Sequence, residues 1–101
     1  MKNSYIFIYN RSLGTKEEVR DFVNSCESII TWRSELSNTF FIVSELSAYK
    51  IYDLVAEYFG EGKGEFLICK YDENNSQGLL NERSWHLLNN NELPPKEKTN
   101  S

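Results

Sequence analysis

The sequence predicts one α+β domain in which four antiparallel strands form a sheet and two helices cover one of its faces. The length of 101 residues suits a single domain. Four short segments are rich in β-branched and aromatic residues, as strands are. Two longer segments between them carry the apolar spacing of amphipathic helices, which gives the order β-α-β-β-α-β.

The first half of the domain is expected to contain a strand, a helix and a second strand. Residues 4–9 (SYIFIY) have strand composition. Thr15-Lys16-Glu17-Glu18 then fits the capping box, and the apolar stripe that follows predicts a helix over residues 16–27. Residues 29–33 (IITWR) predict the second strand.

The second half repeats the scheme in the order strand, helix, strand. A polar connection at residues 34–38 is short enough for a hairpin, so the strand at residues 39–43 should pair antiparallel with the second. Ser47 is the expected cap of the second helix, and Gly60 is its expected end. Residues 65–71 predict the fourth strand, and residues 78–89 a short terminal helix. The domain is thus expected to cover residues 1–89, followed by a polar flexible tail at residues 90–101.

This order of elements is the ferredoxin-like βαββαβ plan. Right-handed crossovers on both sides of the hairpin predict the sheet order 4-1-3-2. The first and third strands should then be central, with both long helices on the same face.

Both faces of this sheet are expected to be apolar, which is unusual for an antiparallel sheet with one solvated face. Two helices cover one face only, so we expect aromatic side chains on an exposed interaction face. That face is expected to comprise Tyr5, Phe7, Tyr9, Trp32 and Phe41. Three coverings are open: a second copy packed sheet on sheet, which we favour, the terminal helix folded back, or single-stranded RNA stacked on the rings.

Composition limits the classes of partner and the cellular location. The net charge is −4 and the basic residues are scattered, so nucleic-acid binding stays open but is not favoured. No apolar run approaches the ~20 residues that span a bilayer, and the first residues are too polar for a signal peptide. Cys26 and Cys69 form neither a disulfide framework nor a zinc spacing. We therefore expect a cytoplasmic protein that does not engage a membrane.

Several blocks of the chain resemble the SinR-like group and the small CRISPR-associated and VapD-like families of ferredoxin-like proteins. These blocks are SYIFIYNR in the first strand, WRSELSNTFFIV at residues 32–43, Leu46-Ser47-Ala48 before the second helix, and Gly78-Leu79 leading to Trp85 and Leu88. Together they cover about residues 4–89. The resemblance implies a compact homodimer. Some members are metal-dependent nucleases that use a strand-1 aspartate from both subunits, and others are structural adaptors.

The chain departs from the nuclease pattern at the end of its first strand. Where those nucleases have Tyr-Asp, this chain has Tyr9-Asn10. A neutral amide oxygen is a weaker Mg²⁺ ligand than a carboxylate, so no cofactor is expected unless the nuclease reading holds. The candidate metal or anion site is Asn10, Arg11, Ser12 and Glu45. Glu45 is included because we expect the third strand to run parallel to the first and to end at the same edge.

No other pattern nominates a catalytic group. His86 has no nucleophile and acid arranged beside it in sequence, and Cys26 and Cys69 are expected to be small core residues. We therefore expect a non-enzymatic binding or adaptor module that acts as a homodimer through protein contacts, in the phage, plasmid or defence setting that the resemblance suggests. The alternatives are a weak metal-dependent endoribonuclease and a single-stranded RNA binder that uses the sheet face.

Overall fold

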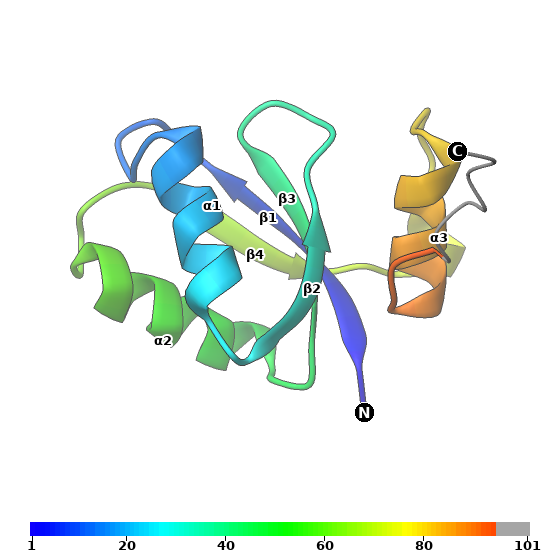
Figure 1. The fold of residues 1–101 in the computed structure, drawn as a ribbon, viewed down its shortest axis with the longest axis horizontal. Helices are drawn as coiled ribbons and strands as arrows, with labels where there is room; N and C mark the ends of the chain where they lie inside the picture. Colours follow the sequence, from blue (N-terminus) through cyan, green and yellow to red (C-terminus); the bar gives the residue numbers. More distant parts are fainter. Residues whose placement is uncertain (95–101) are drawn as a thin grey trace, which may run out of the picture.

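Three layers make up the molecule: helices α1 and α2, a four-stranded antiparallel sheet, and helix α3 (Figure 1). The computed structural model describes residues 1–94. In chain order the elements are β1 (Asn3–Tyr9), α1 (Lys16–Ser25), β2 (Ile29–Arg33), β3 (Thr39–Ser44), α2 (Ala48–Phe59), β4 (Phe66–Lys70), a 3₁₀ turn at Glu73–Asn75, and α3 (Glu82–Asn90). The α+β class and the antiparallel sheet are confirmed. Asn90 closes α3 instead of opening a tail, and the rest of the predicted tail from residue 95 lies outside the described residues.

Local sequence accounts for the helix limits. At α1, the Glu18 amide donates to the Thr15 hydroxyl, and the Thr15 amide donates to the Glu18 carboxylate at 2.8 Å, which is the predicted capping box. Ser47 caps α2 by accepting from the Lys50 amide. Gly60 ends α2 at φ 107°, a conformation that residues with a side chain rarely adopt.

The strands lie in the order β2-β3-β1-β4, which is 4-1-3-2 when read from the β4 edge. β1 is antiparallel to both of its neighbours, and Phe7 lies opposite Phe40 of β3 and Ile68 of β4. β3 pairs with β2 on its other side. All of its residues from Thr39 to Ser44 are buried, so β3 is covered on both faces.

The larger core lies between the sheet and the pair α1 and α2, and the aromatic residues of β1 belong to it. Tyr5, Phe7 and Tyr9 are buried there, and the ring of Phe7 meets that of Phe22 edge to face at 6.5 Å. Trp32 packs on the same core, half-buried. The expectation that these four side chains lie on an exposed face is therefore wrong. Both residue sets of β1 are apolar, so alternation alone did not show which set meets the helices.

A smaller core fills the space between the other sheet face and α3. Phe41 and Val43 are buried there against Leu87 and Leu88, with Ile6, Tyr71, Leu80 and Trp85 packed around them. Phe41 thus lies on the face away from α1 and α2, as expected, but it is buried and not exposed. The terminal helix folds back over the sheet, as one of the three predicted coverings has it. α3 occupies part of the face on which sheet-on-sheet packing was expected, and the rings of Tyr5, Phe7 and Tyr9, on which base stacking was expected, are buried under α1 and α2.

Candidate functional site

Helix α3 is held on the sheet at its N-terminal end by a small polar network. The Glu35 carboxylate accepts from the Asn81 amide at 2.9 Å and from the Ser84 hydroxyl at 2.5 Å. Arg33 in turn donates from Nε to the Ser84 oxygen at 2.7 Å. The Ser84 hydroxyl above all, and then the Asn81 amide, lower the pKa of Glu35 below its usual range. The groups at the start of α3 therefore favour the ionised form of Glu35.

A second polar anchor fixes the C-terminal end of α3. The buried Ser4 hydroxyl lies 2.8 Å from Asn91 Oδ1 and 3.1 Å from the Leu87 carbonyl oxygen. Asn91 ends the helix in the left-handed conformation at φ 58°. Because both ends are tied to strands of the sheet, α3 covers one region of the second face and leaves the rest uncovered.

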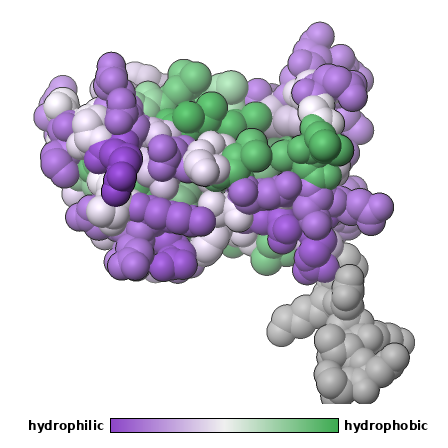
Figure 2. All heavy atoms as spheres, turned by 90° about the horizontal axis from the view of Figure 1, so that it is seen from above, coloured by the Kyte–Doolittle hydropathy of each residue, from purple (hydrophilic) through white to green (hydrophobic). Residues whose placement is uncertain are grey.

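The uncovered region is apolar and hollowed. The hollow has a volume of about 340 Å³ and extends from Ile6 and Ile8 of β1 to the segment before α3. Its rim includes Leu36 and Leu79, which are 46% and 96% exposed. Ile8, 44% exposed, lies beside Leu67 of β4, 58% exposed. We call Ile8, Leu36, Leu67 and Leu79 the open apolar surface. Figure 2 shows a band of apolar residues that runs across the molecule toward the end that carries α3.

The floor of the hollow is suited to an apolar guest. Phe41, Leu80, Trp85 and Leu88 line it. The Tyr71 hydroxyl, also at the hollow, donates to Asn89 Oδ1 at 2.6 Å, and burial raises the pKa of Tyr71. At neutral pH the floor thus offers neutral, largely apolar groups, which can hold a hydrocarbon or aromatic side chain.

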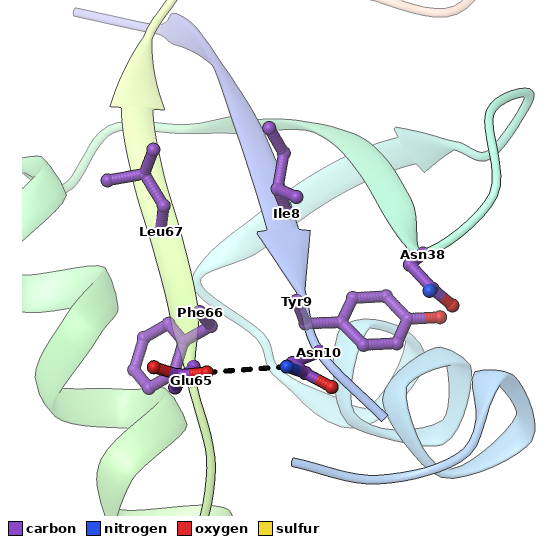
Figure 3. Close-up of a pocket in the computed structure, with 7 residues that line it drawn as sticks. All are labelled: Ile8, Tyr9, Asn10, Asn38, Glu65, Phe66 and Leu67. Carbon is purple, nitrogen blue, oxygen red and sulfur yellow. Dashed lines mark hydrogen bonds between the residues drawn. The ribbon is translucent and has the colours of Figure 1, made fainter. Parts of the chain in front are cut away.

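A second hollow, of about 540 Å³ and with both polar and apolar side chains in its lining, lies where β1 ends (Figure 3). Asn10 donates from its side-chain Nδ2 to Glu65 Oε1 at 3.3 Å, and its backbone N–H donates to the Glu65 carbonyl oxygen at 2.9 Å. The Ser12 hydroxyl accepts from the Glu65 amide at 3.3 Å. Sequence reasoning missed Glu65. The signal was its place at the start of the predicted fourth strand, because the start of an antiparallel neighbour lies beside the end of β1.

Glu45 does not belong to this group, so the predicted cluster is wrong in that member. β3 runs antiparallel to β1, with Ser44 opposite Asn3, so Glu45 lies at the start of β1. There it is 3.8 Å from the Met1 amino nitrogen. The structure brings Asn10 and Ser12 together with Glu65, and it leaves Arg11 exposed beside them.

The other residues weighed from the sequence have simple surroundings. His86 Nε2 lies 3.7 Å from Glu92 Oε2. Cys26 packs half-buried on the larger core as expected, whereas Cys69 is exposed on β4, which corrects its predicted core position. Within residues 1–94, no three His, Cys, Asp or Glu side chains gather closely enough to hold a metal ion.

No family model, curated protein or solved structure matches the chain. Among the helices of the described part, none has the length and apolar character needed to cross a bilayer.

Proposed function

We propose that the protein is a non-enzymatic binding module whose open apolar surface receives an apolar side chain of a protein partner. The observation that carries the proposal is the hollow of about 340 Å³ beside Leu79, which is 96% exposed. Exposed apolar groups that are contiguous with a hollow are typical of interaction sites. The resemblance to the SinR-like group, with its structural adaptors, is compatible with this role.

The size and chemistry of the hollow favour a single anchoring side chain. A volume of about 340 Å³ is at the small end of ligand pockets, which run from roughly 300 to 1,000 Å³. Protein interfaces draw much of their affinity from one or a few aromatic or aliphatic anchors in such pockets. Burying an exposed leucine such as Leu79 in the same event contributes about 1.5–3 kcal/mol.

The hollow at the end of β1 gives less support to an enzymatic function. The only carboxylate that its hydrogen bonds bring to Asn10 is that of Glu65, within the described residues. Mg²⁺ binds best where carboxylates supply charge, and an amide oxygen supplies none. Ordinary strand pairing explains why these two side chains lie together, since Asn10 and Glu65 also share a backbone hydrogen bond.

The test is a photocross-linking experiment followed by a binding measurement. A photoreactive phenylalanine analogue replaces Leu79 in one variant and Tyr58, which is 53% exposed and does not line the hollow, in a control. We expect one protein partner to cross-link at position 79 and not at 58. With that partner purified, calorimetry should show at least tenfold weaker binding for Leu79→Asp and unchanged binding for Tyr58→Asp. A failure to cross-link at 79, or binding that is indifferent to Leu79→Asp, would overturn the proposal.

A further inference from the structure

The outer edge of β4 has unpaired backbone groups. The Asn10 backbone N–H donates to the Glu65 carbonyl and the Tyr71 backbone N–H donates to the Ser4 carbonyl, both at 2.9 Å. Backbone bonds alternate along an antiparallel pair, so every second residue of this segment bonds to β1. The residues between them, which direct their N–H and C=O groups away from the sheet, are Phe66, Ile68 and Lys70. β4 is the last strand on that side, so within residues 1–94 no strand pairs with these groups.

The usual protections of an exposed sheet edge are weak at β4. Natural sheets block such edges with proline, with bulges or with several charged side chains. β4 contains no proline, pairs with β1 without a register shift, and has one charged residue, Lys70, at its end. On the α3 face of the edge, Leu67 is 58% exposed. Such an edge is suited to an extended segment of another chain, whose backbone supplies the missing hydrogen bonds.

Exposed tyrosines of α2 border this edge on the other face of the sheet. Tyr52 stacks on Phe66 with ring centroids 5.2 Å apart, and Tyr52 is 45% exposed. Tyr49 lies one turn earlier on the same side of the helix and is 74% exposed. A side chain of an added strand that points to this face would therefore lie beside aromatic rings.

Tyr52 also borders a hollow of about 370 Å³ that is negatively charged. Asp53, Glu57 and Glu61 line this hollow, and all three side chains are exposed. No ion pair among the described residues involves any of them. The hollow extends to the C-terminal end of α2, where the helix dipole is negative and the last turn has no basic residue. A cationic side chain that runs over the Tyr52 ring would gain from the ring and from these carboxylates.

We propose that an extended segment of a partner protein pairs antiparallel with the β4 edge and carries a basic side chain opposite Phe66. In antiparallel pairing, residues directly opposite each other share a face and exchange both backbone hydrogen bonds. The segment residues opposite Phe66, Ile68 and Lys70 therefore bond to β4 and point to the α2 face. The residues between them point to the α3 face beside Leu67 and Cys69, and they are apolar.

Charge sets the direction and the chemistry of this segment. Lys70 stands at one end of the edge, and the carboxylates beside Tyr52 stand near the other. A segment with an acidic residue at its start and a basic residue at its end complements both when it runs antiparallel to β4. The unpaired backbone thus defines the site, and the surrounding charges define its occupant.

This contact goes beyond the proposed function and does not rest on it. It uses the backbone of β4, whereas the proposed function uses the hollow beside Leu79. The two surfaces adjoin, because Leu67 belongs to the open apolar surface and is also a residue of β4. A single partner can therefore engage both.

The first test measures the binding of synthetic peptides by fluorescence anisotropy. The probe has the sequence Glu-Val-Thr-Val-Arg between two further threonines, with both ends blocked and a fluorophore attached. In the proposed register its glutamate faces Lys70, its central threonine faces Ile68 and its arginine faces Phe66. We expect saturable binding, and binding at least about tenfold weaker when the central threonine is N-methylated, because that nitrogen donates to β4. N-methylation of the preceding valine, whose N–H points away from β4, should change the affinity by less than about threefold, since no hydrogen bond is lost.

Protein variants test the edge from the other side. Lys70→Pro removes an outward N–H without touching the β1 ladder, so the probe should bind at least about tenfold more weakly. Lys70→Ala keeps the N–H and loses the same charge, and it should weaken binding by less than about fivefold. Circular dichroism checks that both variants are folded, and the N-methylated peptides test the pairing without any change to the protein. Leu79→Asp should leave the affinity unchanged, which separates this inference from the proposed function.

A neutral analogue of arginine tests the charge. With citrulline in place of arginine, the probe should bind about two- to fivefold more weakly. That difference should disappear in the double variant Asp53→Asn, Glu57→Gln. Equal affinity of the arginine and citrulline probes for the wild type would overturn the assignment of a basic side chain.

Three other results would overturn the pairing itself. The first is no saturable binding of the probe up to about 1 mM. The second is equal weakening by N-methylation of the central threonine and of the valine. The third is a solution mass, measured by light scattering, that falls from dimer to monomer in Lys70→Pro, because a second copy of the chain would then occupy the edge.

Discussion

Leu87→Ala should release α3 from the sheet. Leu87 is fully buried against Phe41 and Val43. The substitution removes three carbon groups, which at about 0.8 kcal/mol each contribute about 2.4 kcal/mol of lost transfer free energy. The cavity that remains raises the cost within the range of about 2–5 kcal/mol measured for buried leucines. A helix as short as Glu82–Asn90 is not stable by itself in water, so the loss should appear first as undocking of α3.

Native-state hydrogen exchange measures this directly. The amides of α3 should lose protection by the full cost, while those of the central strand β3 keep theirs until global unfolding. Trp85, which packs in the smaller core, should show a red-shifted emission in a Trp32→Phe background. Leu79→Ala, at a position 96% exposed, is the matched control and should change neither signal. Unchanged protection of α3 in Leu87→Ala would refute the argument.

Three further changes test the local arguments. Because the pKa of Glu35 is lowered in the folded state, its ionisation stabilises the fold at pH values above the ordinary glutamate pKa, and this stabilisation is lost as the pH falls through the lower folded-state pKa. The urea midpoint should therefore fall over that pH range, and it should fall less in Glu35→Gln. Gly64→Ala should destabilise by about 1–3 kcal/mol, since its Cβ would lie 2.3 Å from the Leu13 nitrogen, whereas Gly78→Ala, 4.0 Å from Trp85, should be tolerated in the same denaturation assay. Thr15→Ala should cost about 1 kcal/mol in thermal unfolding through loss of the α1 cap, and no effect would contradict the capping role.

Local pattern was enough to predict the elements. The capping box at Thr15, the cap at Ser47 and the helix stop at Gly60 lie where the sequence predicts them. The terminal helix starts later than expected, because Asn81 caps it and residues 76–80 form an irregular segment that lines the hollow. These features depend on neighbours in the chain, so one sequence reveals them.

The assignment of sheet faces could not be predicted in the same way. Alternation shows which residues share a face, but in β1 both sets are apolar, and only the three-dimensional packing decides that Phe7 meets α1 and α2 while Ile6 meets α3. The predicted polar site was wrong in Glu45 because the direction of the third strand was predicted wrongly. The hairpin between β2 and β3 reverses the chain, which places Glu45 beside Met1 and leaves Glu65 beside Asn10.

The central place of β1 also bears on how the chain folds. β1 is formed by residues 3–9, yet its two neighbours are β3 and β4, which end at Ser44 and Lys70. Every hydrogen bond of this strand within the sheet therefore closes a long loop, whose entropy is lost before the pairing energy is gained. Refolding should accordingly be slower than that of a helical bundle of equal length, with β1 added to a hairpin of β2 and β3 that can form from local contacts alone.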